Sequence, residues 1–449
     1  MSHQPVKIPS LRWVRVVPLL IVLNTVAYVD RYNVGYAIAG GLGQDLGMSS
    51  SYAGFAAGIF FWGYLIPQFP GGHLAERGYA KIFITCALVL WSSLTICMGL
   101  VSSGPQFVVL RFFVGLAEGG VFPAVYTILG NWFPAKEAGR ASALFITNTA
   151  FASLIAGPLS GLILGNLGWR ALFVMEGAFS LMLVAVWVPL MSESPARASW
   201  LSREERDYIV AGQVSVDGDE KTAKLDWGAL VRDRNLWLLS IIYLLYHVAN
   251  GGYVVWLPTI TKVITHTSIG VVGFLTVTPF VLSFVGLFVF GTLSDRSLNR
   301  RRYIVISMLS LSVSLAAAGL LGNKGWIAFI PLAASGLFLK PVIGLFWTLP
   351  NLVFGRRDIG AARGIINGIG NLGGFLGPTI VGVATTRTGD FSAGIIIIAG
   401  FLVGGALLTV FLPAITSGIR RLAGDGGTYR TPPGNLSSPK VDTPCGSGH

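Results

Sequence analysis

Long apolar segments, separated by short polar ones, dominate the chain. Each apolar run is about as long as the roughly 20 residues that a helix needs to cross a bilayer. The runs are continuous, whereas barrel strands alternate over segments of about ten residues. The pattern therefore predicts an all-α membrane protein with twelve transmembrane helices, at approximately 15–39, 51–71, 81–101, 106–130, 141–165, 170–191, 236–258, 270–293, 303–322, 326–353, 361–386 and 391–415.

The segments fall into two groups of six. We expect an N-terminal bundle over 1–191, a cytoplasmic central loop over 192–235, a C-terminal bundle over 236–415 and a disordered tail over 416–449 that is rich in Gly, Pro, Ser and Thr. Within the central loop, Ser202 followed by Arg203-Glu204-Glu205-Arg206 predicts a Ser-capped amphipathic helix at the surface.

Composition and charge support this reading. Charged residues make up 12% of the chain, about half the share usual in soluble proteins. The net charge of +12 resides in loops, so it does not indicate a nucleic-acid partner. With both termini in the cytoplasm, the cytoplasmic segments hold 25 of the 32 Lys and Arg residues. This bias predicts the orientation under the positive-inside rule, in a bacterial inner membrane.

The beginning of the chain imitates a secretory signal peptide, with basic residues before an apolar run from Val16 to Val29. We expect it to remain uncleaved, because Asp30 and Arg31 interrupt the approach to the only small-residue site. The cysteines Cys86, Cys97 and Cys445 have no metal-binding spacing. No metal or other cofactor is expected.

The two halves repeat. Gly72 to Arg77 matches Gly291 to Arg296 at an offset of 219 residues (291 − 72), and Pro158 matches Pro378 at 220 (378 − 158). Two parallel six-helix repeats place a cavity at their interface near the middle of the bilayer, as alternating access requires. The repeat therefore predicts a transporter.

The repeated loop, Gly72-x-Leu74-x-Glu76-Arg77-Gly78-x-x-Lys81, resembles the cytoplasmic signature of the major facilitator superfamily. The resemblance spans both halves, although Glu76 stands where Asp is usual. Physically, the acid and the Arg can contact neighbouring helix ends and hold one conformation until transport breaks the contact. The expected latch residues are Gly72, Glu76, Arg77, Lys81, Asp295 and Arg296.

Three further motifs resemble the anion:cation symporter branch of that superfamily. They are Tyr28-x-Asp30-Arg31-x-Asn33, Arg111-Phe112-x-x-Gly115-x-x-Glu118 and Trp347-x-x-Pro350. The resemblance implies uptake of an organic anion driven by protons or sodium, with Asp30 and Glu118 as the coupling pair. The residues expected to bind substrate are Tyr28, Arg31, Tyr64, Arg111, Asn250, Lys340, Trp347 and Asn367.

The charges inside the spans point to the same chemistry independently. A charge at the bilayer centre costs at least about 2.5–3.5 kcal/mol, so it is functional by default. Arg111 and Glu118 lie seven residues apart and share one helix face at different depths. Arg can bind a carboxylate bidentately, and Glu can carry a proton. The alternative is a static cluster that ties the first helix to the fourth. Three cations, Arg31, Arg111 and Lys340, against two acids give the cavity a net charge of +1.

Other positions remain open between two roles. Lys340 lies at the repeat position of Glu118 and can bind substrate or pair with a carboxylate. Asn250 can bind substrate or cap an unwound turn at Gly251-Gly252. For any one aromatic residue, packing is at least as good an explanation as ligand contact, and His247 is expected to be a packing residue.

The leading hypothesis is a secondary active importer, a monomer, that moves a small organic anion together with protons. An exporter or exchanger of the same fold is the alternative, because gradients set the direction. A membrane-embedded enzyme lacks a nucleophile, base or metal constellation, and a receptor that does not transport is a third class. Sugar acids and hydroxy dicarboxylates suit the Asn and Tyr residues, whereas phthalate-like acids suit the Trp and Phe residues. We favour the hydroxy acids.

Overall fold

The computed structural model describes residues 10–214, 226–297, 299–355 and 358–412. The predicted tail over 416–449 lies outside the described residues. The first half consists of α1 (Leu11–Ala39), α2 (Leu42–Asp45), α3 (Ser50–Gly58), α4 (Phe60–Leu65), α5 (Gln68–Leu74), a π-helical turn (Ala75–Tyr79), α6 (Ala80–Met98), α7 (Gly104–Glu118), α8 (Val121–Trp132), α9 (Ala135–Ile146) and α10 (Asn148–Leu190).

Three short helices connect the halves: Pro195–Arg197, α11 (Arg203–Val214) and α12 (Trp227–Arg232). The second half consists of α13 (Arg234–Thr265), α14 (Ile269–Leu275), α15 (Val277–Ser297), α16 (Arg300–Leu320), a 3₁₀ turn (Gly322–Lys324), α17 (Trp326–Phe346), α18 (Pro350–Val353), α19 (Ile359–Thr388) and α20 (Phe391–Val410).

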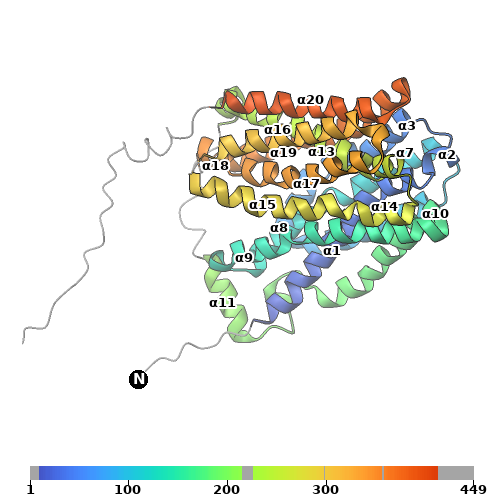
Figure 1. The fold of residues 1–449 in the computed structure, drawn as a ribbon. Helices are drawn as coiled ribbons and strands as arrows, with labels where there is room; N and C mark the ends of the chain where they lie inside the picture. The colour runs from blue at the N-terminus through green and yellow to red at the C-terminus, as the bar shows by residue number, and fades with distance from the viewer. Residues whose placement is uncertain (1–9, 215–225, 298, 356–357, 413–449) are drawn as a thin grey trace, which may run out of the picture. The chain divides into compact units, whose positions relative to one another are not determined.

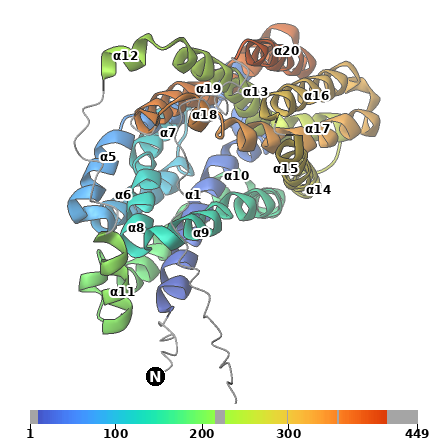
Figure 2. The ribbon, with the colours of Figure 1, turned by 90° about the vertical axis from the view of Figure 1, so that its left-hand side faces the viewer.

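The long helices run side by side between two faces (Figure 1). We call the face at which α1 begins the near face and the face at which α1 ends the far face. Viewed from the near face, the blue-to-green helices of the first half and the yellow-to-red helices of the second half form two groups (Figure 2). The described residues form no strand. The predicted all-α class with two helical bundles is confirmed.

Nine stretches of the described chain are long and apolar enough to cross a membrane. Two of them, Ser50–Met98 and Ala135–Leu190, cross twice. Each reverses at a glycine with positive φ, Gly78 at 87° or Gly168 at 80°, a conformation that favours glycine. The second crossing of each of these two stretches brings the nine to eleven. Helix α19, whose Arg and Asn residues lower its hydropathy, is the twelfth predicted crossing.

The central loop contains the predicted surface helix, α11. The Ser202 hydroxyl accepts a hydrogen bond from the Glu205 backbone N–H at 3.2 Å, which confirms the cap. Glu205 also binds the buried Arg12 guanidinium at 2.6 Å, and the second nitrogen of Arg12 binds Glu137 at 2.7 Å. Tyr208 donates a hydrogen bond to Glu137, which raises the pKa of that tyrosine. These contacts fix α11 to α1 and α9 at the near face.

Of the two roles left open for Asn250, capping an unwound turn at Gly251-Gly252 is excluded. Both glycines lie inside the continuous helix α13. A side chain on Gly251 would lie 3.1 Å from the Gly374 Cα, and one on Gly252 would lie 3.1 Å from the Gly377 carbonyl oxygen. The glycines therefore let α13 and α19 pack backbone to backbone, and Asn250 has no unwound turn to cap.

Candidate functional site

Close packing of α4 against α7 positions the charged residues of the first half. A Cβ atom on Gly63 would lie 2.1 Å from the Phe112 carbonyl oxygen, and one on Gly115 would lie equally close to that of Phe60. Only glycine permits this approach. It places the aromatic rings of α4 next to the two charges of α7, Arg111 and Glu118.

Asp30 and Arg31 are neighbours on α1 but face different helices. Asp30 is 2% exposed, and its Oδ2 accepts hydrogen bonds from Trp91 Nε1 of α6 at 3.0 Å and from Ser180 Oγ of α10 at 3.3 Å. Arg31 points toward α7 and pairs with Glu118, with Nε 2.6 Å from Oε1. The two predicted coupling acids therefore lie in different surroundings, and the ion pair belongs to Glu118.

The Arg31 guanidinium lies between two aromatic rings. Its central carbon is 4.4 Å from the ring centre of Tyr64 and 4.7 Å from that of Tyr28, within the range of cation–π attraction. The Arg31 side chain is 16% exposed and the Glu118 side chain only 1%. Arg31 is thus the more accessible partner, and three of the predicted substrate residues come together around it.

Arg111 is 3% exposed and binds the backbone of α1. Its two terminal nitrogens donate to the carbonyl oxygens of Asp30, at 3.4 Å, and Arg31, at 3.3 Å, and its guanidinium covers the Phe60 ring. Its Nε is buried without a hydrogen-bond partner. In this conformation Arg111 therefore ties α7 to α1 at the position of the two acids.

Glu176 of α10 is a third buried acid that the sequence interpretation missed. It is 5% exposed and accepts a hydrogen bond from Asn33 Nδ2 at 2.5 Å. The predicted net charge of +1 is therefore wrong, because three acids accompany the three cations. An acidic residue within the predicted span 170–191 was the signal that could have identified it.

The second half contributes an aromatic group around His247. The Tyr243 ring centre is 4.3 Å from that of His247 and 5.0 Å from that of Trp347. Trp347 follows the end of α17, and Lys340 lies seven residues earlier on the same helix, near His247. No carboxylate of the described residues lies within 4 Å of Lys340. The structure thus places Lys340 with His247 and Trp347, and not in contact with Glu118.

Asn250 and Asn367 are half-buried, on α13 and α19 respectively. These two helices pack closely against each other, but no side-chain contact joins the two amides to the charged group of the first half within the described residues. Their roles in substrate binding stay predictions.

The loop signature lies at the near face. A Cβ atom on Gly72 would lie 3.4 Å from the Pro123 Cβ of α8, an ordinary contact distance, so the packing in this conformation does not itself require glycine. The side chains of Glu76 and Asp295 are 73% and 75% exposed, and Asp295 lies 3.9 Å from Arg300. The Lys81 backbone N–H, at the beginning of α6, donates to the Glu193 carboxylate at 3.0 Å. In this conformation Glu193 is therefore the acid that binds the helix end, and the latch role of the signature stays a prediction.

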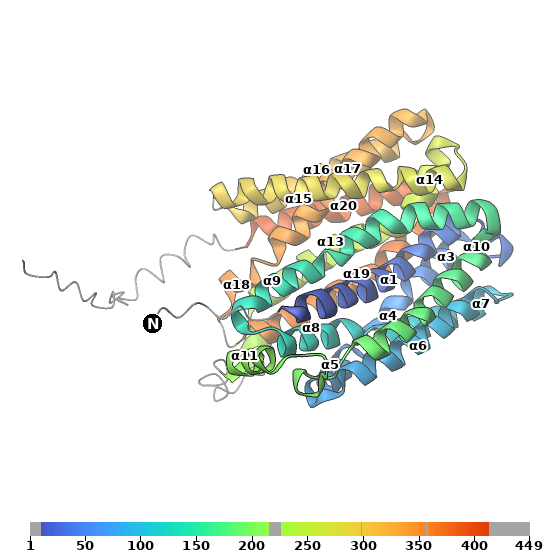
Figure 3. The same ribbon diagram turned by 90° about the horizontal axis from the view of Figure 1, so that it is seen from below.

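At the far face the two halves touch directly. Tyr36 Oη lies 2.8 Å from Thr276 Oγ1, and the Ser51 hydroxyl lies 2.8 Å from Thr386 Oγ1. Lys262 Nζ donates to the Ala39 carbonyl oxygen at 2.8 Å. Figure 3 shows α3, α14 and the bend of α10 together at this face. Contacts from α1, α3, α13, α19 and the residue between α14 and α15 hold the halves together here.

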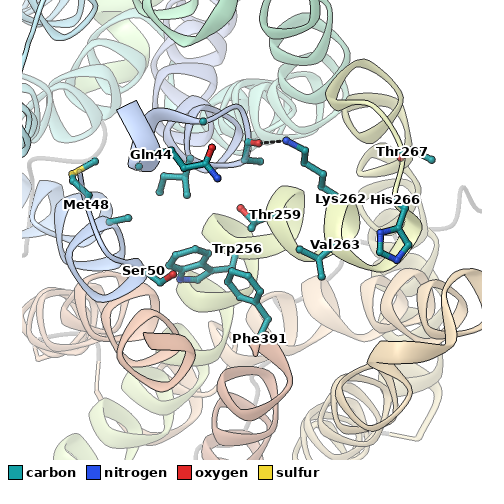
Figure 4. A pocket seen from close by; sticks show the side chains of 15 residues that line it. Gln44, Met48, Ser50, Trp256, Thr259, Lys262, Val263, His266, Thr267 and Phe391 are labelled. Atoms are coloured by element: carbon teal, nitrogen blue, oxygen red, sulfur yellow. Dashed lines mark hydrogen bonds between the residues drawn. The ribbon is translucent and has the colours of Figure 1, made fainter. Parts of the chain in front are cut away.

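A cavity of about 560 Å³ opens beside the Lys262 contact. Figure 4 shows the Lys262 side chain extending from α13 to α1. Trp256 and Thr259 of α13 and Phe391 of α20 line the cavity beside it. The Trp256 indole donates to the Pro378 carbonyl oxygen at 2.9 Å, so this residue braces α13 against α19. The Thr259 hydroxyl is buried without a hydrogen-bond partner.

Comparison with known proteins agrees with this geometry. The family model described as Major Facilitator Superfamily matches residues 20–378 and 262–438. A putative tartrate transporter of Agrobacterium vitis is 32% identical over 410 residues, which cover 89% of each chain. A quinolone resistance transporter of Acinetobacter baumannii is 30% identical over 89% of this chain and 93% of its own.

The fold is also similar to that of a bacterial homologue of the human lysosomal transporter Spinster, solved in an inward-facing, unoccupied conformation. The TM-score is 0.70 at 16% sequence identity, over 91% of this chain and 97% of that one. The predicted resemblance to the superfamily is confirmed.

We expect Lys262→Met to loosen the far face, because it removes the hydrogen bond between α13 and the end of α1. With Thr259→Cys as a reporter on a background without the native cysteines, labelling by a membrane-impermeant thiol reagent should become several times faster. Lys324→Met, a change at an exposed lysine near the same face, is the control. Equal labelling rates in both variants would show that Lys262 does not hold the halves together.

Proposed function

Because this chain belongs to the major facilitator superfamily, we propose that it is a proton-coupled symporter that carries a small organic anion across the bacterial inner membrane by alternating access. The chain is a multi-pass membrane transporter and not an enzyme. In the proposed arrangement the near face, which contains the loop signature, is cytoplasmic, as the distribution of Lys and Arg predicts.

The ion pair between Arg31 and Glu118 carries this proposal. Arg31 is the more accessible cation of the first half, and the carboxylate that occupies it belongs to the chain itself. A substrate carboxylate and the ionised Glu118 therefore compete for one guanidinium. When Glu118 takes up a proton, Arg31 is free to form charge-assisted hydrogen bonds with the substrate. Anion binding and proton binding then favour each other reciprocally.

The charge of the buried group supports the same coupling. With Asp30, Glu118 and Glu176 ionised, the first half holds three acids against Arg31 and Arg111. Protonating two acids leaves one net positive charge, which a monovalent carboxylate neutralises. In a cavity of low dielectric constant, any net charge left on the buried group and its substrate is strongly unfavourable. Sodium could balance the charge in the same way only if several oxygen ligands surrounded the ion. We therefore propose protons as the coupling ion.

The proposed substrates are hydroxy acids such as tartrate and sugar acids. Tyr28, Tyr64 and the two half-buried amides offer hydrogen-bonding groups for hydroxyls, and one relative is named as a putative tartrate transporter. Lys340, with no carboxylate partner among the described residues, would accept a second carboxylate once the halves close around the substrate. We propose that the transporter acts as a monomer, because each proposed site residue comes from one chain.

Export of an organic anion is the second candidate. A relative that shares 30% identity is named as a quinolone resistance transporter, and the fold permits either direction. Uptake by proteoliposomes under an imposed pH gradient, with a panel of tartrate, galactarate and phthalate, distinguishes the candidates. Accumulation inside alkaline vesicles supports symport, and proton-driven expulsion supports the exporter.

We expect Glu118→Gln to abolish proton-driven accumulation while anion exchange between the two sides continues. The amide is isosteric with the protonated acid, so it fixes the state in which Arg31 is free. Glu137→Gln removes an acid that also pairs with an arginine, Arg12, and serves as the control. Intact accumulation in the Glu118 variant would remove this residue from coupling.

We propose that Arg111 releases the two backbone carbonyls when the anion enters and binds its carboxylate bidentately, so Arg111→Lys should weaken anion binding about tenfold, because an ammonium cannot span two oxygens as the guanidinium does. Calorimetry on the purified protein measures the affinity. Arg140→Lys, at the cation over the Trp13 ring near the beginning of α1, is the matched control. Unchanged affinity in the Arg111 variant would restrict this arginine to tying α7 to α1.

Lys340→Gln should weaken a dicarboxylate much more than its monocarboxylate analogue, because only the dicarboxylate loses a charge-assisted contact. The comparison uses uptake of tartrate against glycerate, with Lys324→Gln as the control. An equal loss for both acids would support pairing with a carboxylate of the chain. An unchanged preference and unchanged uptake would show that Lys340 does not reach the cavity.

A further inference from the structure

Glu176 is the buried acid that the proposed exchange at Arg31 does not use. It lies on α10, within the first half, and is 5% exposed. The described residues place no Lys or Arg nitrogen within 4 Å of its carboxylate. An ionised carboxylate in such a place carries a high desolvation cost unless a cation or several hydrogen bonds offset it.

Only one of the two carboxylate oxygens of Glu176 accepts a hydrogen bond from Asn33. Asn33 Nδ2 donates to Glu176 Oε2 at 2.5 Å, whereas Glu176 Oε1 and Asn33 Oδ1 are both buried without a hydrogen-bond partner. Both of these oxygens are acceptors when the carboxylate is ionised. They cannot then satisfy each other, and two buried acceptors remain without a donor from each other, which destabilises the ionised form.

A proton on Glu176 gives both of these oxygens a hydrogen-bond partner, because the carboxylic acid donates to the amide oxygen. The acid and the side-chain amide have complementary edges, with one donor and one acceptor each. We propose that Glu176 is a proton-binding site, whose acid form Asn33 holds by two hydrogen bonds: Nδ2–H to Oε2, and Oε1–H to Oδ1. The proton binds to Oε1, and no other bond changes. A role of Glu176 in coupling rests on the proposed function, whereas its binding of a proton does not.

The charges around Glu176 come from two helices. Asp30 of α1 and Arg111 of α7 are the charged groups that lie around Glu176, and the Ser160 hydroxyl of α10, buried without a hydrogen-bond partner of its own, also lies near the Glu176 carboxylate. Trp91 of α6 contributes a hydrogen bond to Asp30 only. Helix α14 has no titratable residue, and Asp295 and Arg296 of α15 lie at its near-face end. Asp30 is thus the neighbour most strongly linked to the proton on Glu176.

The positions of Asp30 and Asn33 along α1 indicate when a proton entering the protein would reach Glu176. Asn33 lies three residues beyond Asp30 on α1, about 4.5 Å closer to the far face. The Ser180 hydroxyl lies 2.9 Å from the Glu176 backbone carbonyl oxygen and 3.3 Å from Asp30 Oδ2, so its one proton can be donated to either, and it lies between the two acidic residues. A proton that arrives from the far face therefore meets Glu176 before Asp30.

Infrared difference spectroscopy on the purified full-length protein between pH 5 and pH 8, in H₂O and D₂O, tests the site without any substrate. We expect Glu176→Gln to remove one carboxylic acid band and to leave the others. The glutamine amide can make the same two hydrogen bonds to Asn33, so we expect the variant to fold. An unchanged set of acid bands would overturn the inference.

Asn33→Leu gives a second measurement that does not depend on the Glu176 variant. Loss of both hydrogen bonds should move the same band to higher frequency. The control is Asn24→Leu, which breaks a comparable bond between α1 and α10, from Asn24 Nδ2 to Asn148 Oδ1 at 2.9 Å, and should leave the band in place. A band that does not move in Asn33→Leu also overturns the inference.

The outcome can be separated from that of the proposed function. If no organic acid is taken up under a pH gradient but Glu176→Gln removes the band, the proposed function fails and the proton site stands. If uptake is proton-driven and Glu176 also supplies a coupling proton, Glu176→Gln should lower the number of protons per anion by one, as measured from the reversal potential of flux. An unchanged number would limit Glu176 to proton binding without coupling and overturn its place in proton entry.

Discussion

The Arg31–Glu118 ion pair is the interaction on which the proposed mechanism depends. A guanidinium buried in a membrane protein needs a counter-charge, and here the chain supplies one from the neighbouring helix α7. The substrate can replace that counter-charge only when a proton neutralises it. Coupling then follows from charge balance alone, with no separate device to link the two events. The rings of Tyr28 and Tyr64 hold the guanidinium in place during the exchange.

The rest of the structure keeps this pair buried and defined. Glycines bring α4 against α7 next to the charged group, and other glycines bring α13 against α19 in the second half. Arg111 holds α1 to α7 at the position of the pair. At the far face, contacts from Tyr36, Ser51 and Lys262 join the halves. An alternating-access cycle has to break these contacts and form others at the near face, where Glu76 and Asp295 are exposed.

The helical fold could be predicted from the sequence because a bilayer requires long apolar helices. The breaks at Gly78 and Gly168 fall between predicted spans for the same reason. The charges of the first half could be located, since Asp30, Arg31, Arg111 and Glu118 interrupt apolar runs. Their partners could not, because pairing depends on the rotation of α1 relative to α7 and α10. Spacing along one helix cannot give that rotation, so Arg111 was not expected to bind backbone carbonyls.

One open alternative was excluded and one sequence interpretation failed, each for an identifiable reason. Gly251 and Gly252 resemble a helix break, yet the helix continues because α19 packs against them. Glu176 stood within a predicted span but outside the motifs that carried the family resemblance, and its partner Asn33 is 143 residues away along the chain. Contact between such distant residues is a property of the fold and not of local sequence.

The most direct test of the central claim is the number of protons that the purified protein takes up when an anion binds. Titration calorimetry with tartrate, or with another acid of the panel that binds, in buffers of different ionisation enthalpy gives this number at each pH. Competition between Glu118 and the anion for Arg31 predicts net proton uptake that grows as the pH rises through the range in which Glu118 loses its proton. Anion binding with no proton uptake at any pH, or with proton release, would contradict the account.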